Sequence, residues 1–196
     1  HLPSPSRGAG QRGGHAALTV RLGPFTVRVE ARLQGFRRLF GLMYDGFPML
    51  DPGSFADFHI ALRHPLNFRA WLNRQVLFQH DGRTLFEPFP EDTAFPLFEW
   101  GLNWCVGQNA HQFLILHAAT VERAGRALLL PALPGSGKST LCAALVSRGW
   151  RLLSDEFGLF DLQRRCLVPF PRPIALKNAS IEVIARYAPD AVIGPV

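Results

Sequence analysis

The stretch Ala132-Leu-Pro-Gly-Ser-Gly-Lys-Ser139 decides the fold that this sequence predicts. It fits the pattern G-x-x-x-x-G-K-[ST], with alanine in place of the first glycine. The apolar run Ala127–Leu130 precedes it, and we expect a helix from Ser139 to Ser147 after it. A buried strand, a glycine-rich loop and a helix in this order indicate a loop that binds phosphate groups.

The residue types in this loop suit the binding of a nucleotide. We expect Gly135 and Gly137 to let backbone amides turn toward phosphate oxygens, beside the positive end of the helix. Lys138 would bridge the β- and γ-phosphates, Ser139 would ligate Mg²⁺, and Thr140 would support the turn. The expected ATP-binding residues are Pro134, Gly135, Ser136, Gly137, Lys138, Ser139 and Thr140. The alternative is a glycine-rich turn that only caps a helix.

An acidic pair, Asp155 and Glu156, follows the apolar run Leu152–Leu153, 17 and 18 residues after Lys138. One short helix and one strand fill this gap. We expect that strand to lie parallel and close to the strand before the loop, which would bring both carboxylates beside the γ-phosphate. One carboxylate would hold Mg²⁺, and the other would orient or deprotonate an attacking hydroxyl. The alternative is a pair of strand-end acids that face solvent.

A histidine, His117, is the third candidate element of the site. It follows the apolar strand Phe113–Leu116 and lies 21 residues before Lys138. Taken alone, a histidine in this place is more often a hydrogen-bonded histidine of the core than an active-site residue.

These three elements together resemble HPr kinase/phosphorylase, a family of bacterial serine kinases with a phosphoenolpyruvate-carboxykinase-like core. The resemblance rests on His117-Ala118, on the loop and its helix ending at Arg148-Gly149, and on Asp155-Glu156. Two further segments are similar to the subgroup called HprK-related kinase A, which is found beside exosortase systems. They are Pro171-Arg-Pro-Ile-Ala-Leu-Lys-Asn178 and Phe95-Pro-Leu-Phe-Glu-Trp-Gly-Leu-Asn-Trp-Cys105. The resemblance covers about residues 18–196.

The resemblance implies a role for each matching residue. His117 and Lys138 would be active-site residues, Ser139 would bind Mg²⁺, and Glu156 occupies the position of a proton-accepting Asp. Of the two carboxylates, Asp155 is the one that we expect to bind Mg²⁺ together with Ser139. The family has Asp where this chain has Glu156, so the base is either Asp155 or Glu156. Ala118 replaces a glycine of the family, and the later signature with a Mg²⁺-binding Glu is not recognisable. Arg172 and Lys177 are further cations that we expect near the site, where either could neutralise phosphate charge. The alternative for each is a surface charge or a neighbour of a helix.

The expected fold is α/β: a P-loop core of the phosphoenolpyruvate-carboxykinase/HPr-kinase type with a smaller N-terminal α+β domain. Residues 1–17 would form a flexible lead, 18–112 the N-terminal domain, and 113–196 the kinase core, which the resemblance suggests is incomplete at its C-terminus.

Local patterns predict the other elements. Hairpins are expected within 19–30 and at Asp81-Gly82, since glycine-containing turns there separate alternating apolar and polar residues. Helices are expected before Pro48, at 95–106 with Trp100 and Trp104 in the core, and at 178–187. Strands at 157–161 and 166–170 are expected to pair.

Composition limits the classes of protein that remain. Apolar residues make up 47% and charged residues 18%, which argues against disorder, and no apolar run is long enough to span a bilayer. The net charge of +6 arises in residues 1–40, which contain seven arginines and one acidic residue, Glu30. This basic region could attract nucleic acid, lipid or an acidic partner, but no recognition motif accompanies it, and we expect solvated charges and no nucleic acid. Three scattered cysteines suggest buried free thiols in a reducing cytoplasm.

The function expected from these residues and from the resemblance is an Mg²⁺/ATP-dependent kinase. It would transfer the γ-phosphoryl group to a hydroxyl, most simply a serine of a small protein or peptide. An ATP-binding regulatory or assembly module with little turnover, and a small-molecule kinase, are the alternatives. The parent family forms hexamers, which leaves a homo-oligomer open.

Overall fold

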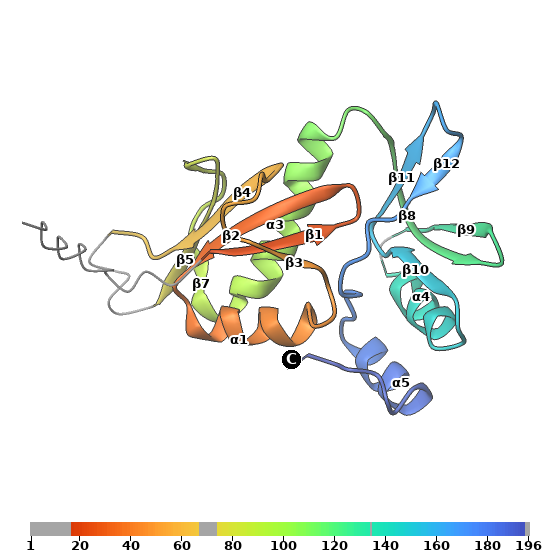
Figure 1. The fold of residues 1–196 in the computed structure, drawn as a ribbon. Helices are drawn as coiled ribbons and strands as arrows, with labels where there is room; N and C mark the ends of the chain where they lie inside the picture. The colour runs from red at the N-terminus through yellow and green to blue at the C-terminus, as the bar shows by residue number, and fades with distance from the viewer. Residues whose placement is uncertain (1–16, 67–73, 134, 195–196) are drawn as a thin grey trace, which may run out of the picture.

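The computed structural model describes residues 17–66, 74–133 and 135–194. The predicted flexible lead therefore lies outside the described residues except for its last residue, and Pro134 also lies outside them. Within the described ranges, two β-sheets and four α-helices form a mixed α/β fold (Figure 1). None of the helices in these ranges is both long and apolar enough to cross a membrane.

The first sheet contains seven strands from the N-terminal half of the chain. They are β1 (Leu18–Leu22), β2 (Phe25–Ala31), β3 (Met49–Leu50), β4 (Phe58–Arg63), β5 (Gln75–His80), β6 (Arg83–Thr84) and β7 (Phe89–Pro90). Their order is β3-β1-β2-β4-β5-β6, with β7 also paired to β5, and only β2 and β4 run parallel. Helix α3 (Ala94–Asn109), which follows the 3₁₀ turn η1 (Glu91–Thr93), packs on β4 and β5, and α1 (Gln34–Met43) contacts α3.

Two tight turns confirm the predicted hairpins of this sheet. Asp81 and Gly82 join β5 to β6 with φ of +48° and +76°, as a two-residue hairpin turn requires. Gly23 joins β1 to β2 with φ of +56°. A Cβ on Gly23 would lie 1.9 Å from the carbonyl oxygen of Pro169, so only glycine lets the hairpin approach this later segment so closely.

The second sheet is antiparallel and comes from the C-terminal half. Its strands are β8 (Leu114–Arg123), β9 (Arg126–Pro131), β10 (Arg151–Ser154), β11 (Phe157–Asp161) and β12 (Cys166–Val168). Strand β8 lies in the middle: Val121 pairs with Leu128 of β9 on one side and with Leu152 of β10 on the other. Strand β11 continues along the same side as β10, with Phe157 opposite His117, and pairs with β12 as predicted.

One helix packs on the second sheet, a second helix contacts the first, and both were predicted. Helix α4 (Lys138–Val146) packs against β8, β9 and β10, and α5 (Ala179–Tyr187) contacts α4. A small core forms between α4 and the sheet around the buried residues Ala119, Val121 and Cys142. This packing fixes the start of α4, and with it the end of the glycine-rich loop, against the middle of the sheet.

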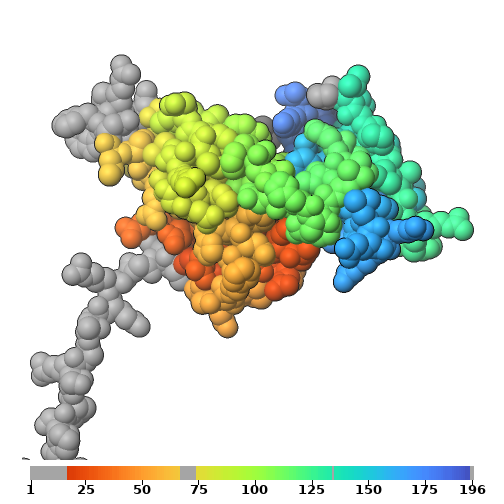
Figure 2. Space-filling view, turned by 90° about the horizontal axis from the view of Figure 1, so that it is seen from above, coloured from red at the N-terminus to blue at the C-terminus, as the bar shows by residue number. Residues whose placement is uncertain are grey.

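The main hydrophobic core connects the two halves of the molecule. The ring of Phe25 in β2 lies 6.2 Å from that of Phe113 and 5.6 Å from that of Phe170, both in edge-on contacts. Leu159 and Phe170 are fully buried members of the core that the N-terminal strands and helices form. The two halves pack side by side (Figure 2), while the division at residue 112 stays a prediction.

The expectation that two parallel neighbouring strands carry the loop and the acidic pair is wrong. Strands β9 and β10 run in the same direction, but β8 separates them. The reason is that β8 continues to Arg123, where the two-residue turn Ala124-Gly125, with φ of +53° and +75°, reverses the chain. The chain then returns as β9, paired to β8. Asp155 and Glu156 therefore lie at the break between β10 and β11 rather than at the end of a sheet.

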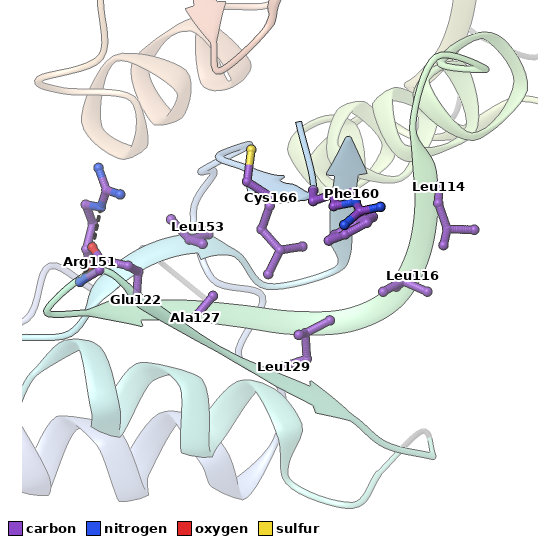
Figure 3. A pocket seen from close by; sticks show the side chains of 12 residues that line it. Leu114, Leu116, Glu122, Ala127, Leu129, Arg151, Leu153, Phe160 and Cys166 are labelled. Atoms are coloured by element: carbon purple, nitrogen blue, oxygen red, sulfur yellow. Dashed lines mark hydrogen bonds and ion pairs between the residues drawn. The ribbon is translucent and has the colours of Figure 1, made fainter. Parts of the chain in front are cut away.

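The prediction that Ala127–Leu130 is a buried strand is also wrong. In β9, Leu128 and Leu129 are 38% and 37% exposed. The side chains of Leu129 and Leu153 lie on the face of the second sheet that points away from α4, and they are 37% and 3% exposed. Leu116, Leu129, Leu153 and Phe160 line a hollow of about 640 Å³ there (Figure 3). An apolar run does not reveal whether one or both faces of its strand are covered.

Three further residues predicted to be buried are exposed. Trp100 and Trp104 in α3 are 50% and 38% exposed, and their rings lie 4.3 Å and 6.2 Å from that of Phe86. Cys166 is exposed, whereas Cys105 and Cys142 are buried as expected. Because α3 is apolar on nearly all sides, its sequence does not identify the side that faces solvent.

The contact between α3 and β5 can be tested with two glycines of the same helix. A Cβ on Gly101 would lie 2.2 Å from the ring of Phe78, so Gly101→Ala should lower the free energy of unfolding by about 1–3 kcal/mol. A Cβ on Gly107 would meet nothing within 4 Å, so Gly107→Ala should raise it by about 0.5–1 kcal/mol. Urea unfolding measures both changes, and equal effects of the two substitutions would contradict this packing.

Candidate functional site

The glycine-rich loop ends where α4 begins. Gly135 and Gly137 have φ of +82° and +88°, in the left-handed region that favours glycine. A Cβ on either would meet nothing within 4 Å, so the backbone conformation and not packing requires these glycines. The amides of Lys138, Ser139 and Thr140 belong to the first turn of α4, where backbone N–H groups have no acceptor within the helix. These amides are available to an anion.

The side chain of Lys138 extends from the start of α4 to the acidic pair. Its ammonium donates to the backbone carbonyl oxygen of Asp155 at 2.6 Å and lies 3.6 Å from Oε2 of Glu156. The side chain is only 12% exposed. The single helix and strand between Lys138 and the acids thus bring them together, as predicted, although the strands are arranged differently.

Asp155 is a buried carboxylate with one oxygen engaged and one free. Its Oδ2 accepts hydrogen bonds from the Ser139 hydroxyl at 3.0 Å and from the Ala175 amide at 3.2 Å. Its Oδ1 is buried and has no hydrogen-bond partner among the described residues. Burial raises the pKa of Asp155 above its ordinary value of 3.8, although the charge of Lys138 and the bonds from Ser139 and Ala175 oppose the rise.

Glu156 lies between Lys138 and His117. Its Oε1 is 3.3 Å from Nε2 of His117, and its side chain is 32% exposed. The buried hydroxyl of Ser154 accepts from the amides of Glu156 at 3.3 Å and Phe157 at 3.0 Å. This turn interrupts the edge formed by β10 and β11 and directs Glu156 to the same place as Lys138. With a side chain 60% exposed, His117 is not a core histidine.

The structure therefore brings together most of the predicted site residues. His117, Lys138, Ser139, Asp155 and Glu156 form one connected cluster. Among the loop residues, Ser136 instead bonds locally, its hydroxyl donating to the carbonyl oxygen of Leu133 at 2.7 Å, and Thr140 is half-buried in α4.

Neither of the two further cations expected near the site forms a hydrogen bond or ion pair with the cluster within residues 17–66, 74–133 and 135–194. The guanidinium of Arg172 is bound to Glu99 and Asn103 of α3 and is 7% exposed. Lys177 is exposed, and no hydrogen bond or ion pair of its ammonium occurs among the described residues.

Sequence reasoning missed two groups that shape the cluster: the Ser154 hydroxyl and the Ala175 amide. Neither has a local signal, because both act from places that only the folded chain brings together. The ion pair between Arg172 and Glu99, in contrast, did have a local signal in the sequence. Glu99 is the only charged residue in the apolar helix α3, and a lone acid in such a helix indicates a buried partner of opposite charge.

Two oxygen atoms of the cluster could contribute to holding a divalent metal ion. Oδ1 of Asp155, which has no hydrogen-bond partner among the described residues, and the hydroxyl of Ser139 are hard oxygen ligands. The two lie close together because the Ser139 hydroxyl donates to Oδ2 of the same carboxylate. Across the described ranges, no group of three or more His, Cys, Asp or Glu side chains could hold a metal ion alone. Mg²⁺ suits such a sparse set, since proteins commonly bind it through one or two side chains together with substrate phosphates.

Comparisons with protein-family models, with curated proteins and with solved structures found no match. The interpretation of the site therefore rests on its geometry.

The burial of Asp155 should appear in the pH dependence of stability. Its pKa is higher in the folded than in the unfolded chain, so the unfolded chain loses this proton first as the pH rises. The contribution of Asp155 to the free energy of unfolding therefore falls as the pH rises from about its ordinary value through the raised folded value. Asp155→Asn should abolish this fall. In urea unfolding at several pH values, the variant should gain stability relative to wild type from pH 3 to pH 7. A constant difference would contradict the burial of an ionisable Asp155.

Proposed function

We propose that the protein is an Mg²⁺/ATP-dependent kinase that transfers the γ-phosphoryl group to a hydroxyl, with a P-loop core and an N-terminal α+β domain. One observation carries the proposal. The ammonium of Lys138, at the start of a helix that follows a glycine-rich loop, contacts both members of the acidic pair Asp155-Glu156. A loop that binds phosphate and a pair of carboxylates that handle metal and proton are the parts that phosphoryl transfer needs.

The phosphates of ATP would bind at the N-terminal end of α4. The amides of its first turn and the positive end of the helix dipole attract anions there. The positive φ of Gly135 and Gly137 supports a loop whose backbone curves around the phosphates. Lys138 would exchange its contact with Glu156 for the phosphate charge, which its long side chain allows.

The metal site would use Ser139 and Asp155. The support for this assignment is the pair of oxygens already described: a hydroxyl bonded to the carboxylate, and a buried Oδ1 without a partner. Bound there, Mg²⁺ would neutralise charge on the phosphates and orient them. The Ala175 amide would keep the carboxylate in place.

Glu156 would act as the base. It is more exposed than Asp155, so an acceptor hydroxyl can reach it, and it is not engaged by Ser139. The hydroxyl proton would pass to the Glu156 carboxylate as the hydroxyl oxygen forms a bond to the γ-phosphorus. The bond from that phosphorus to the bridging oxygen would break, and its electrons would leave with ADP. His117, 3.3 Å from Glu156, would orient the carboxylate.

The acceptor that we propose is a serine of a protein or peptide, since the site resembles that of serine kinases. A small-molecule hydroxyl would use the same cluster. If the chain binds ATP and labels no acceptor, it is instead a regulatory or assembly module.

The two lysines of the chain provide a matched test of the phosphate site. Lys138→Met should weaken ATP binding and lower transfer from γ-labelled ATP to a mixture of serine-containing peptides by about a hundredfold or more, because the charge on the phosphates loses its partner. Lys177→Met removes an exposed lysine and should change neither ATP binding nor label transfer. Calorimetry measures the binding. Equal transfer by wild type and Lys138→Met would contradict the proposal.

The two acids should separate metal binding from proton transfer. Asp155→Asn should abolish the gain in ATP affinity that Mg²⁺ gives, because a metal ligand is lost. Glu156→Gln should preserve this gain but lower label transfer by about 10²–10⁴-fold, the usual contribution of a general base. Calorimetry with and without Mg²⁺, together with label transfer, measures both. If Glu156→Gln abolished the gain from Mg²⁺ and Asp155→Asn preserved it, Glu156 would be the metal ligand and Asp155 the base.

A further inference from the structure

A buried polar cluster joins the second half of the chain to helices α1 and α3. The guanidinium of Arg172 donates to the backbone carbonyl of Glu99 and to its carboxylate, each at 3.1 Å, and also to the side-chain oxygen of Asn103. The other carboxylate oxygen of Glu99 accepts from the hydroxyl of Tyr44, the residue after α1. The guanidinium also lies 4.9 Å from the centre of the Phe170 ring. Arg172 therefore contacts α3 and its own segment directly, and Glu99 links it to Tyr44 at the end of α1.

The segment that carries Arg172 leads directly to the metal-binding acid of the proposed site. At its start, the Phe170 amide donates to the Leu153 carbonyl at 2.7 Å, two residues before Asp155. Three residues after Arg172, the Ala175 amide donates to Oδ2 of Asp155. Between them, Pro173 fixes a φ angle, and Ile174 packs against the small core under α4. A displacement of Arg172 would therefore move the Ala175 amide.

We propose that Arg172 is a positioning residue: by anchoring the 170–175 segment to α3, it holds the Ala175 amide against Asp155 and so tunes the affinity of the site for Mg²⁺. The N-terminal half of the chain thereby acts on the phosphate site without touching it. This inference rests on the proposed function for its effect on Mg²⁺, whereas the anchoring of the segment is independent of it.

The chemistry of Arg172 suits anchoring and not phosphate binding. Both terminal nitrogens of its guanidinium are engaged by Glu99 and Asn103, so they are not available to a nucleotide. A planar fork with several fixed donors holds a position better than a flexible ammonium does. Partners that orient a metal ligand from outside commonly change metal affinity by about 10–100-fold when they are removed.

The test uses a variant that breaks the anchor without leaving a buried charge. Arg172→Met alone would leave Glu99 unpaired and could unfold the chain, so Glu99→Gln is added to it. Arg172→Lys keeps the charge but not the fork and should give an intermediate effect. Arg164→Met, at an arginine with an 80% exposed side chain and only a surface ion pair, is the control.

Two measurements on the full chain decide the proposal. Amide exchange followed by NMR should show that the Ala175 amide exchanges at least about tenfold faster in Arg172→Met/Glu99→Gln than in wild type, because local opening controls exchange. Calorimetry should show that the gain in ATP affinity given by Mg²⁺ falls by about tenfold, with ATP affinity in EDTA unchanged. Arg164→Met should match wild type in both.

Each alternative outcome has a defined meaning. Unchanged exchange at Ala175 in the folded double variant overturns the proposal. Faster exchange with an unchanged effect of Mg²⁺ also overturns it, because Arg172 would then only stabilise the fold. If wild type itself does not bind Mg²⁺ and ATP, the proposed function fails, and the exchange measurement alone decides whether Arg172 holds the Asp155 partner in place.

Discussion

The contact of the Lys138 ammonium with the carbonyl of Asp155 and the carboxylate of Glu156 is the interaction on which the site depends. It ties the first residue of α4 to the break between β10 and β11. Helix α4 and strand β10 both pack on β8 and also contact each other. One cation thus balances two acids that would otherwise repel each other at close range. The same contact is what a bound phosphate would replace.

The second constraint is the burial of Asp155. A carboxylate whose pKa is raised by burial, with one oxygen that has no partner in the described part of the chain, costs stability. Such a cost is typical of functional sites, where a ligand supplies the missing interaction. Its neighbours come from distant parts of the chain: Ser139 from α4, Ala175 from the segment anchored by Arg172, and through Arg172 the helix α3. The N-terminal half of the molecule is therefore linked to this carboxylate through Arg172 and the 170–175 segment.

The sequence predicted the cluster better than the sheet that carries it. The glycine-rich loop, Lys138 and the acidic pair could be recognised in the sequence because each is a short local motif. The helix between Lys138 and the acidic pair could be recognised because its sequence pattern is clear. The position of β8 between β9 and β10 could not be recognised in the sequence, since it depends on pairing between distant strands. The exposure of Leu129 and Trp100 was also missed, because apolar residues give the same pattern on covered and uncovered faces. Arg172 was expected near the site because its charge is visible in the sequence, whereas its partner Glu99 lies 73 residues away in the chain.

The most direct test of the central claim is an NMR titration of the isotope-labelled chain with Mg²⁺ and a non-hydrolysable ATP analogue. If the loop is a phosphate cradle opposite the acidic pair, the amide resonances of Gly135 to Thr140 and of Asp155 and Glu156 should shift together and saturate with one affinity. Resonances of these residues that stay unchanged, or shifts confined to the hollow around Leu116 and Leu129, would contradict the account.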